Sequence, residues 1–266
     1  MIIKDLGKPL AVGRTAELFP WQGGWVLKLF HNWFELENIL FEQRMAQAVH
    51  ASGLPVPMAG EVIQVNGRNG LLYERVDGQN IWDILQKQPW RLFALARQTA
   101  QLHAEMHANI LQPGIPPQRH RLENRLRGAD PLPDSFKRTL VANLSALPDG
   151  NRICHGDFHP GNILITSTRA VIIDWIDASR GNPLAVVART TVIILGATAS
   201  SQIPSRILKA FVHLFHTVYL HRYFQLCPGS KNEYRRWLPV VAAARLCENI
   251  PELEGWLLEQ VYQGLR

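Results

Sequence analysis

Cysteine is scarce in this chain, with only Cys154, Cys227 and Cys247 among 266 residues. Three cysteines cannot all pair, and their spacing fits no zinc-binding pattern, so the sequence argues against a disulfide framework and a structural zinc site. The first residues, MIIKD, also lack the apolar segment of a secretory signal peptide. These absences predict a protein of the reducing cytoplasm.

Long apolar runs and dense basic runs are missing as well. The most apolar stretch, residues 190–199, is too short to span a bilayer and predicts a buried helix. The 28 Lys and Arg exceed the 22 Asp and Glu, but no dense basic run or RNA-binding motif accounts for the net charge of +6. We interpret the short basic clusters at residues 119–121 and 235–236 as solvated faces. We expect no membrane and no nucleic-acid partner, and the oligomeric state stays open.

Length and composition are those of an ordinary globular enzyme. Hydrophobic residues make up 47% of the chain and charged residues 19%, which is enough apolar material for a sizeable core. A chain of 266 residues is large for one core, so we expect one two-lobed domain or two small domains.

The most informative segment is residues 153–175, which read ICHGDFHPGNILITSTRAVIIDW. Asp157 is followed five residues later by Asn162, and Asp174 lies twelve residues further on. Two β-type runs joined by a turn-like Ser-Thr-Arg lie between Asn162 and Asp174, and a tight hairpin would return Asp174 to the side of Asn162. This arrangement is typical of kinase phosphoryl transfer. One Asp accepts the proton of the acceptor hydroxyl, and the Asn and the second Asp hold Mg²⁺ on the nucleotide phosphates.

Residues 155–162, HGDFHPGN, resemble the catalytic loop of the aminoglycoside phosphotransferase/choline kinase-like family, whose pattern is H-G-D-x-H-x-x-N. The resemblance implies an α+β, protein-kinase-like two-lobed fold, with a small β-rich N-lobe that contains one long helix and a larger, mostly helical C-lobe. We expect a nucleotide-binding lobe at 1–76 and a catalytic, acceptor-binding lobe at 77–266. The resemblance also implies that ATP and Mg²⁺ are used, with Asp157 as the base and Asn162 and Asp174 as metal ligands.

A kinase of this kind also needs a lysine on a strand and an acidic partner on the next helix. The strand-like run Val-Leu-Lys-Leu-Phe contains Lys28. Residues 32–51 have the apolar spacing of a helix, with Asn32 as its expected N-cap and Gly53 as its stop. Glu42 lies inside this helix, at the spacing of the family's helix glutamate. We expect Lys28 to contact the α and β phosphates and Glu42 to position it.

The turn that would cover the phosphates is expected at Gly13, Arg14 and Thr15, where the chain enters its first hairpin. A glycine there leaves backbone amides unhindered and close to phosphate. The family pattern has a second glycine at the start of this loop, and Ala11 stands there in this chain. The departure concerns the geometry of the loop rather than nucleotide binding itself.

The adenine edge is expected to meet the backbone of residues 74–78. This segment follows two predicted strands, at 61–65 and 70–74, which an Asn-Gly turn separates. Within the segment, Glu74 and Val76 are the candidate nucleotide-binding residues. The resemblance assigns them the hinge between the two lobes.

Four histidines require an interpretation. His103 and His107 stand four residues apart on a predicted helix, but the zinc-protease motif needs a glutamate directly after the first histidine, and Ala104 is there instead. A structural role near the catalytic loop is favoured for both. His155 resembles the structural histidine that opens a kinase catalytic loop. For His159, a hydrogen bond that stabilises the loop is favoured over acid–base chemistry.

A second departure from the family follows Asp174. The family commonly has aspartates at the positions of Asn182 and Val186, and the aspartate at the second position would hydrogen-bond the backbone of the catalytic loop. Valine cannot do so. Either another residue supports the loop, or the loop is looser and turnover is slower. A nucleotide-binding pseudokinase or regulatory partner is therefore the alternative to a working phosphotransferase.

The charge of the C-terminal part bears on the acceptor. From residue 178 onward the chain has no aspartate, five glutamates and ten Lys or Arg. A pocket for a polycationic aminoglycoside should be lined with carboxylates, so this balance disfavours such an acceptor. We therefore predict transfer of the γ-phosphoryl group to a hydroxyl of a neutral or anionic small molecule.

Overall fold

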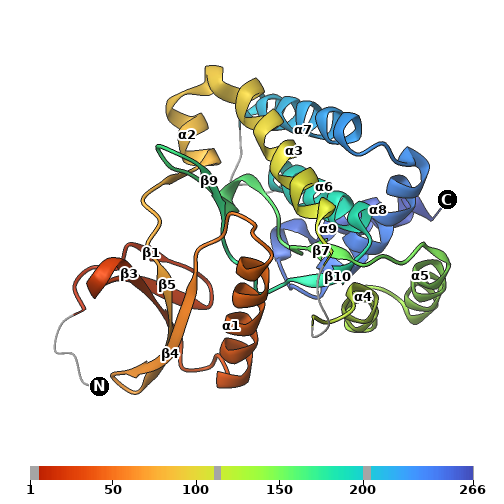
Figure 1. Cartoon of the computed structure of the whole chain (residues 1–266). Coiled ribbons are helices and arrows are strands. Elements are labelled where there is room, and N and C mark those ends of the chain that lie inside the picture. The colour runs from red at the N-terminus through yellow and green to blue at the C-terminus, as the bar shows by residue number, and fades with distance from the viewer. Residues whose placement is uncertain (1–5, 111–114, 200–204, 266) are drawn as a thin grey trace. The chain divides into compact units, whose positions relative to one another are not determined.

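The computed structural model describes residues 6–110, 115–199 and 205–265, which form two compact units (Figure 1). The first unit contains the described residues up to 80 together with 162–176. The second contains residues 81–161 and the described residues from 177 onward. The first unit is rich in strands and the second is mostly helical, which confirms the predicted α+β class. The lobe boundaries 1–76 and 77–266 stay a prediction.

The first unit is built on a five-stranded antiparallel sheet with the strand order β1-β2-β3-β5-β4. Its strands are β1 (Ala11–Val12), β2 (Ala16–Trp21), β3 (Trp25–Phe30), β4 (Ala59–Val65) and β5 (Arg68–Glu74). A 3-10 turn, η1 (Gln22–Gly24), joins β2 to β3. The Asn-Gly turn joins β4 to β5, with both residues at positive φ (52° and 78°), as a tight hairpin between strands requires.

Side-chain alternation along β3 gives the sheet two different faces. Leu27 and Leu29 are buried in one hydrophobic cluster, and Phe30 is buried in another that also contains Ile39 of helix α1. Lys28 lies between the two leucines in sequence and therefore points to the side of the sheet that carries α1. Period-two patterning alone thus directs the predicted lysine toward the helix that holds its partner.

Helix α1 (Leu36–Ala51) starts later than we predicted. Its N-cap is Glu35, and no side chain caps it, so the prediction of Asn32 as the N-cap is wrong. Gly53 adopts φ 81° and donates its amide to the carbonyl of His50, so the predicted stop is confirmed. The apolar periodicity identified the helix, but the residues before Leu36 form a turn instead of its first turn.

A second, three-stranded sheet in the first unit contains the hairpin after the catalytic loop. Its strands are β6 (Gln79–Asn80), β8 (Ile163–Ile165) and β9 (Ala170–Ile172), in the order β6-β8-β9. Ile163 pairs with Ile172, and the amide of Ile173 donates to the carbonyl of Asn162 at 3.0 Å. The hairpin therefore has the expected register, which returns Asp174 to the side of Asn162.

The described helices of the second unit include one that is strongly apolar, α6. They are α2 (Ile81–Lys87), α3 (Leu92–Ala108), α4 (Gln118–Arg127), α5 (Asp134–Ala146), α6 (Pro183–Ala199), α7 (Arg206–Leu226), α8 (Lys231–Leu246) and α9 (Pro251–Gly264). The remaining elements of the described residues are the 3-10 turns η2 (Pro89–Arg91) and η3 (Pro160–Asn162) and a two-stranded sheet of β7 (Arg152–Cys154) and β10 (Ser179–Gly181).

Helix α6 packs against α7, α8 and α9, and most of its side chains are buried, as predicted for residues 190–199. None of the described helices combines the length and the hydropathy that a membrane span requires. Strand β7 ends at Cys154, directly before the catalytic loop, and its partner β10 begins at Ser179, after the β8–β9 hairpin. The loop thus leaves a short sheet whose strands are held in antiparallel register.

Candidate active site

Lys28, Glu42 and Asp174 lie together in the first unit. Lys28 Nζ donates to Glu42 Oε1 at 2.6 Å and lies 3.3 Å from Asp174 Oδ1. Strand β3 supplies the lysine, α1 supplies the glutamate, and the second residue after the β8–β9 hairpin supplies the aspartate. Three segments that are far apart in sequence therefore bring two carboxylates to one ammonium group.

Glu42 is completely buried, although a glutamate is rarely buried without partners. Its Oε1 accepts hydrogen bonds from Lys28 and from the Tyr73 hydroxyl at 2.8 Å. Its Oε2 has no hydrogen-bond partner among the described residues. The charge of Glu42 is thus balanced by Lys28, and a buried salt bridge of this kind positions its members at the expense of their hydration.

The charge state of Lys28 follows from two opposed effects. Burial by itself would lower the pKa of the ammonium, but the carboxylates of Glu42 and Asp174 outweigh burial and raise the pKa above its ordinary value. Lys28 therefore stays positively charged throughout the physiological pH range. A permanent charge on a side chain that is only 14% exposed is what the recognition of phosphate oxygens requires.

Asn162 and Asp174 are joined by the hairpin that separates them. Asp174 has φ 66°, in the left-handed region that aspartate tolerates better than most residues, and its side chain is 41% exposed. Amide and carboxylate oxygens are the ligands that Mg²⁺ prefers. The chemistry of these two side chains therefore fits the metal predicted for them. Elsewhere, no group of three or more His, Cys, Asp and Glu among the described residues is placed to hold a metal.

The predicted phosphate-covering turn joins β1 to β2. The amide of Gly13 donates to the carbonyl of Ala16 at 2.8 Å, and a Cβ on Gly13 would lie 3.3 Å from the same oxygen. Glycine thus keeps this turn tight. Arg14 is exposed, and the carbonyl of Thr15 accepts from the amide of His31. The turn is where the sequence predicted it, and its role with phosphates stays a prediction.

Glu74 and Val76, the predicted hinge residues, follow the last long strand of the sheet. Glu74 ends β5, its amide donates to the carbonyl of Met58, and its Oε1 lies 3.7 Å from an Arg169 nitrogen. Val76 is half-buried two residues later. The carboxylate of Glu74 is thus used within the first unit, and only backbone groups of this segment remain candidates for the adenine edge.

Asp157, the predicted base, belongs to the second unit and is held by two histidines. The amide of Asp157 donates to His155 Nδ1 at 3.1 Å, and the amide of Gly161 donates to His159 Nδ1 at 3.1 Å. A ring nitrogen that accepts carries no proton, so both rings are protonated on Nε2 when neutral. His159 Nε2 then faces Asp157 Oδ2 at 3.6 Å. Both histidines support the loop, as the sequence favoured.

The pKa of Asp157 lies well below its ordinary value. Burial would raise it, but the hydrogen-bonding imidazole of His159 and the positive charge of Arg189 lower it more strongly. Asp157 is therefore a carboxylate at neutral pH. It can orient a hydroxyl group and take its proton late in a transfer reaction, although it is too weak a base to remove that proton beforehand.

The catalytic loop is supported by α6, at the two residues after the apolar segment around Val186. Arg189 Nε donates to the carbonyl of Gly156, and the Thr190 hydroxyl donates to the carbonyl of Phe158 at 2.7 Å. Gly156 itself has φ 82°, and any Cβ there would clash with the backbone of Asp177. The support that was expected from an aspartate at position 186 thus comes from an arginine about one turn further along the same helix.

Sequence reasoning missed Arg189, although a signal was present. A single arginine at the edge of a long apolar helix must find partners, because a charge is almost never buried alone. Arg189 is 6% exposed and pairs with Glu248 Oε1 at 2.7 Å, and it lies 3.7 Å from Asp177 and 3.9 Å from Asp157. It therefore connects the predicted base to two further carboxylates.

The prediction that the basic cluster at 119–121 is a solvated face is wrong. Arg119 donates to the carbonyl of Leu147 at 2.7 Å, and Arg121 donates to Asp177 at 2.7 Å, so neither arginine belongs to a simple solvated face. The pattern misled because α4 has charged residues on most of its sides, and only packing decides which of them turn inward. Residues 235–236 are exposed, as predicted.

His103 and His107 form a structural pair behind the loop. His103 Nδ1 lies 2.7 Å from the hydroxyl of Tyr219, and His107 Nδ1 lies 2.8 Å from that of Tyr223. The ring of His103 packs on Phe158 of the catalytic loop, with a centroid distance of 4.1 Å. Burial, the main cause, lowers the pKa of His107 to about 3, so it is neutral at physiological pH. The structural interpretation is confirmed.

Three solved structures with a similar fold carry the names of kinases that act on small molecules. The amicoumacin kinase hAmiN, in complex with AMP-PNP, Ca²⁺ and Ami, superposes with a TM-score of 0.63 at 17% identity, over 99% of this chain and 89% of that one. A putative fructosamine-3-kinase from Haemophilus somnus 129PT also gives 0.63, at 14% identity and 97% and 90% coverage. Choline kinase from Cryptosporidium parvum Iowa II gives 0.58, at 12% identity and 97% and 87% coverage. These likenesses establish a protein-kinase-like fold.

Among curated proteins, none matches the chain. The profile of the phosphotransferase enzyme family, APH, matches residues 13–222, which is most of the sequence, and the chain belongs to this family. The protein is accordingly a phosphotransferase that acts on the hydroxyl groups of small molecules. The sequence-based resemblance is confirmed.

Proposed function

We propose that this protein transfers the γ-phosphoryl group of ATP, with Mg²⁺, to a hydroxyl group of a neutral or anionic small molecule. The observation that carries the proposal is the contact of one partly buried lysine, Lys28, with both Glu42 and Asp174. A lysine steadied by a helix glutamate and adjacent to a metal-binding aspartate is the arrangement by which kinases hold the phosphates of ATP.

Each predicted residue then has a defined task. Lys28 binds the α and β phosphate oxygens, and Glu42 keeps its ammonium group in place. Asn162 and Asp174 would hold the metal through their amide and carboxylate oxygens. When bound there, Mg²⁺ would neutralise charge on the phosphates of the nucleotide. In the second unit, Asp157 orients the acceptor hydroxyl and accepts its proton as the new phosphate ester forms.

The backbone around the nucleotide supports the same proposal. The tight turn with Gly13, Arg14 and Thr15 would cover the phosphates, and the backbone of the hinge, around Glu74 and Val76, would meet the adenine. The amicoumacin kinase, which has a similar fold, forms a complex with AMP-PNP and Ca²⁺. From this likeness we infer that the present chain also uses ATP and a divalent metal ion. We also propose that the reaction takes place in the cytoplasm, where ATP is available.

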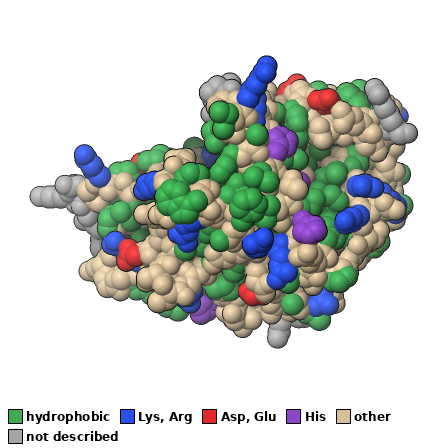
Figure 2. Space-filling model, turned by 90° about the horizontal axis from the view of Figure 1, so that it is seen from above, with side chains coloured by type: hydrophobic (Ala, Val, Ile, Leu, Met, Phe, Trp, Pro, Cys, Tyr) green, Lys and Arg blue, Asp and Glu red, His purple; other side chains and the backbone are tan. Residues whose placement is uncertain are grey.

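The alternative of a pseudokinase rested on Val186, which cannot support the catalytic loop. Arg189 and Thr190 bond the carbonyls of Gly156 and Phe158, so the loop has support from the same helix. This arrangement favours a working enzyme over a degraded one. The charge of the surface favours an acceptor that is not a polycation, because Lys and Arg clearly outnumber Asp and Glu on the face in Figure 2.

The test is transfer itself. Purified protein is incubated with Mg²⁺, γ-labelled ATP and a broad library of hydroxyl compounds, and labelled products are detected by chromatography and mass spectrometry. We expect phosphate esters of neutral or anionic compounds, and none with Asp157→Asn protein that still binds nucleotide. The absence of any product across the library, with nucleotide binding intact, would support the pseudokinase instead. Efficient phosphorylation of kanamycin-type aminoglycosides would contradict the predicted acceptor class.

A further inference from the structure

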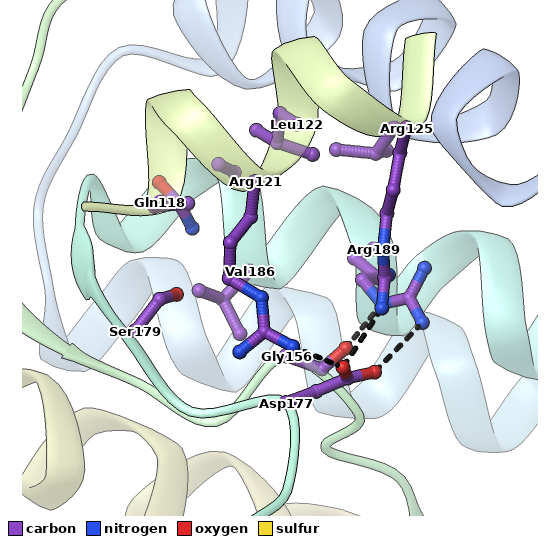
Figure 3. A pocket seen from close by; sticks show the side chains of 11 residues that line it. Gln118, Arg121, Leu122, Arg125, Gly156, Asp177, Ser179, Val186 and Arg189 are labelled. Atoms are coloured by element: carbon purple, nitrogen blue, oxygen red, sulfur yellow. Dashed lines mark hydrogen bonds and ion pairs between the residues drawn. The ribbon is translucent and has the colours of Figure 1, made fainter. Parts of the chain in front are cut away.

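Four guanidinium groups gather in the second unit around three carboxylates. They belong to Arg121 and Arg125 of α4, Arg189 of α6 and Arg245 of α8, and the carboxylates are those of Asp157, Asp177 and Glu248. We call these seven side chains the arginine cluster. Positive charges therefore exceed negative charges by one within the cluster. Figure 3 shows the guanidinium groups of Arg121, Arg125 and Arg189 converging on Asp177.

Asp177 and Glu248 hold the arginines of the cluster in place. Asp177 Oδ1 accepts from Arg121 at 2.7 Å and from Arg125 at 2.8 Å. Glu248 accepts from Arg189 at 2.7 Å and lies 3.2 Å from Arg245 and 3.8 Å from Arg125. The last distance is too long for a direct hydrogen bond.

Arg245 has a buried donor that lacks a partner among the described residues. A guanidinium has five N–H donors, and that of Arg245 forms an ion pair with Glu248. Its Nε is buried and has no hydrogen-bond partner among the described residues, although its side chain is only 11% exposed. A buried charged donor without a partner is costly, so its retention points to a ligand that supplies the missing acceptor.

The electrostatics favour an additional anion. Burial, the largest cause, lowers the pKa of Arg121 and of Arg245. Asp177 opposes this effect at Arg121 and Glu248 opposes it at Arg245, but neighbouring arginines add to it and the net shift of each pKa is downward. A negative group beside them would stabilise their charged forms. Guanidinium forks bind carboxylate and phosphate oxygens through paired hydrogen bonds, which an ammonium group cannot reproduce.

The arginine cluster includes the proposed base, Asp157. Arg189 lies 3.9 Å from Asp157 and bonds Glu248, which in turn contacts Arg245. Beside Arg121, Arg125 and Arg189 is a cavity of about 30 Å³, lined also by Gly156 of the catalytic loop (Figure 3). This volume holds a water molecule or the end of a ligand rather than a whole substrate. A molecule anchored here would keep the rest of its atoms outside the cavity, near the loop.

We propose that the arginine cluster binds a carboxylate or phosphate group of the acceptor, through Arg125 and Arg245, while the acceptor hydroxyl meets Asp157. The acceptor is thus an anionic hydroxyl compound, which the arginines select through its carboxylate or phosphate group. The inference rests on the proposed function for its catalytic consequence, but the binding of an anion can be measured without turnover.

The binding test uses inorganic phosphate and malonate as separate probes. Both are titrated calorimetrically into protein saturated with Mg²⁺ and a non-hydrolysable ATP analogue, so that the nucleotide site is filled. Wild-type protein should bind at least one probe, and the preferred probe distinguishes phosphate from carboxylate. Arg245→Met should weaken binding by about tenfold or more, and Arg245→Lys by less, because the charge remains. Arg125→Met should weaken it similarly and replaces Arg245→Met if that variant is unfolded.

The control is Arg235→Met, which removes an exposed arginine from the same helix and should bind as wild type does. The proposal is overturned if the wild type binds neither probe, or if the Arg245 and Arg125 variants bind as tightly as the control. In the acceptor library, matched pairs of free acid and methyl ester, or phosphate and alcohol, then test the catalytic consequence. Anion binding without any phosphoryl transfer would refute the proposed function and leave the anion site standing.

Discussion

Replacement of Arg189 by methionine tests how the catalytic loop is held. The side chain is 7% exposed, its Nε bonds the carbonyl of Gly156, and its Nη2 bonds Glu248 at 2.7 Å. Loss of one member of a buried ion pair costs 3–5 kcal/mol in typical cases. Glu248 keeps Arg245 at 3.2 Å, so we expect the lower end, a loss of about 3 kcal/mol in the free energy of unfolding.

The same change should slow catalysis more than it weakens nucleotide binding. Without Arg189, the carbonyl of Gly156 is released and Asp157 loses a positive neighbour, so the base moves from its proper position. Misplacement of a catalytic group by about 1 Å can cost on the order of a hundredfold in rate. We therefore expect kcat to fall by roughly that factor, with little change in the KM for ATP.

The assay combines urea unfolding, followed by circular dichroism, with steady-state kinetics on an acceptor from the library. Arg180→Met, at an exposed arginine of β10, is the matched control and should leave both stability and kcat near wild type. Arg189→Lys should recover part of the stability, because it restores the charge but not the fork. If Arg189→Met unfolds at the same urea concentration as the control and keeps its kcat, the loop is held by other contacts and the reasoning fails.

Three further predictions concern the catalytic residues and a buried histidine. Asp157→Asn should lower kcat by about a thousandfold with an unchanged Kd for Mg·ATP, whereas Asp174→Asn should weaken the Mg²⁺-dependent binding of ATP. Initial rates measure kcat and calorimetry measures Kd. The assignment fails if Asp157→Asn weakens binding and Asp174→Asn changes only kcat. A double-mutant cycle of Lys28→Ala and Glu42→Ala should give a coupling free energy of roughly 1–2 kcal/mol, calculated from the rates of phosphoryl transfer. Additive losses of activation free energy would disprove the pairing. His107 is neutral when buried, with a folded pKa of about 3 against about 6.5 unfolded, so its contribution is constant above pH 6.5 and stability declines as pH falls below that value. At pH 5 this effect lowers the free energy of unfolding by about 2 kcal/mol. If the stability of His107→Phe fell as steeply with decreasing pH as that of the wild type, His107 would not be the cause.

Local patterns were sufficient to predict much of the first unit and the contact of Lys28 with Glu42 and Asp174. The hairpin between Asn162 and Asp174 follows from two apolar runs and a turn, because a short loop leaves the strands only one close pairing. The alternation of β3 directs Lys28 to the side of α1, since successive strand side chains point to opposite faces. Glu42 then lies on the helix that covers that face. These effects are short-range or periodic, so they can be predicted from the sequence alone.

Helix ends and basic clusters were predicted less well. Asn32 has a residue type that caps helices, but α1 begins at Leu36, because capping preferences are weak beside tertiary packing. The arginines of α4 looked solvated, yet Arg121 turns toward Asp177. Charge alone does not indicate which side of a helix meets a neighbour when most of its sides are polar.

The sequence by itself determined the class of fold, the family and the candidate residues for phosphoryl transfer, because those depend on fixed spacings along one segment. Only the tertiary structure decided how the catalytic loop is supported without an aspartate at Val186. That task moved to Arg189, whose partners Asp177 and Glu248 lie 12 and 59 residues away in the chain. Such partners are brought together by the packing of helices, and no local pattern specifies which buried charges will meet. The excess of guanidinium groups beside the proposed base follows from the same packing.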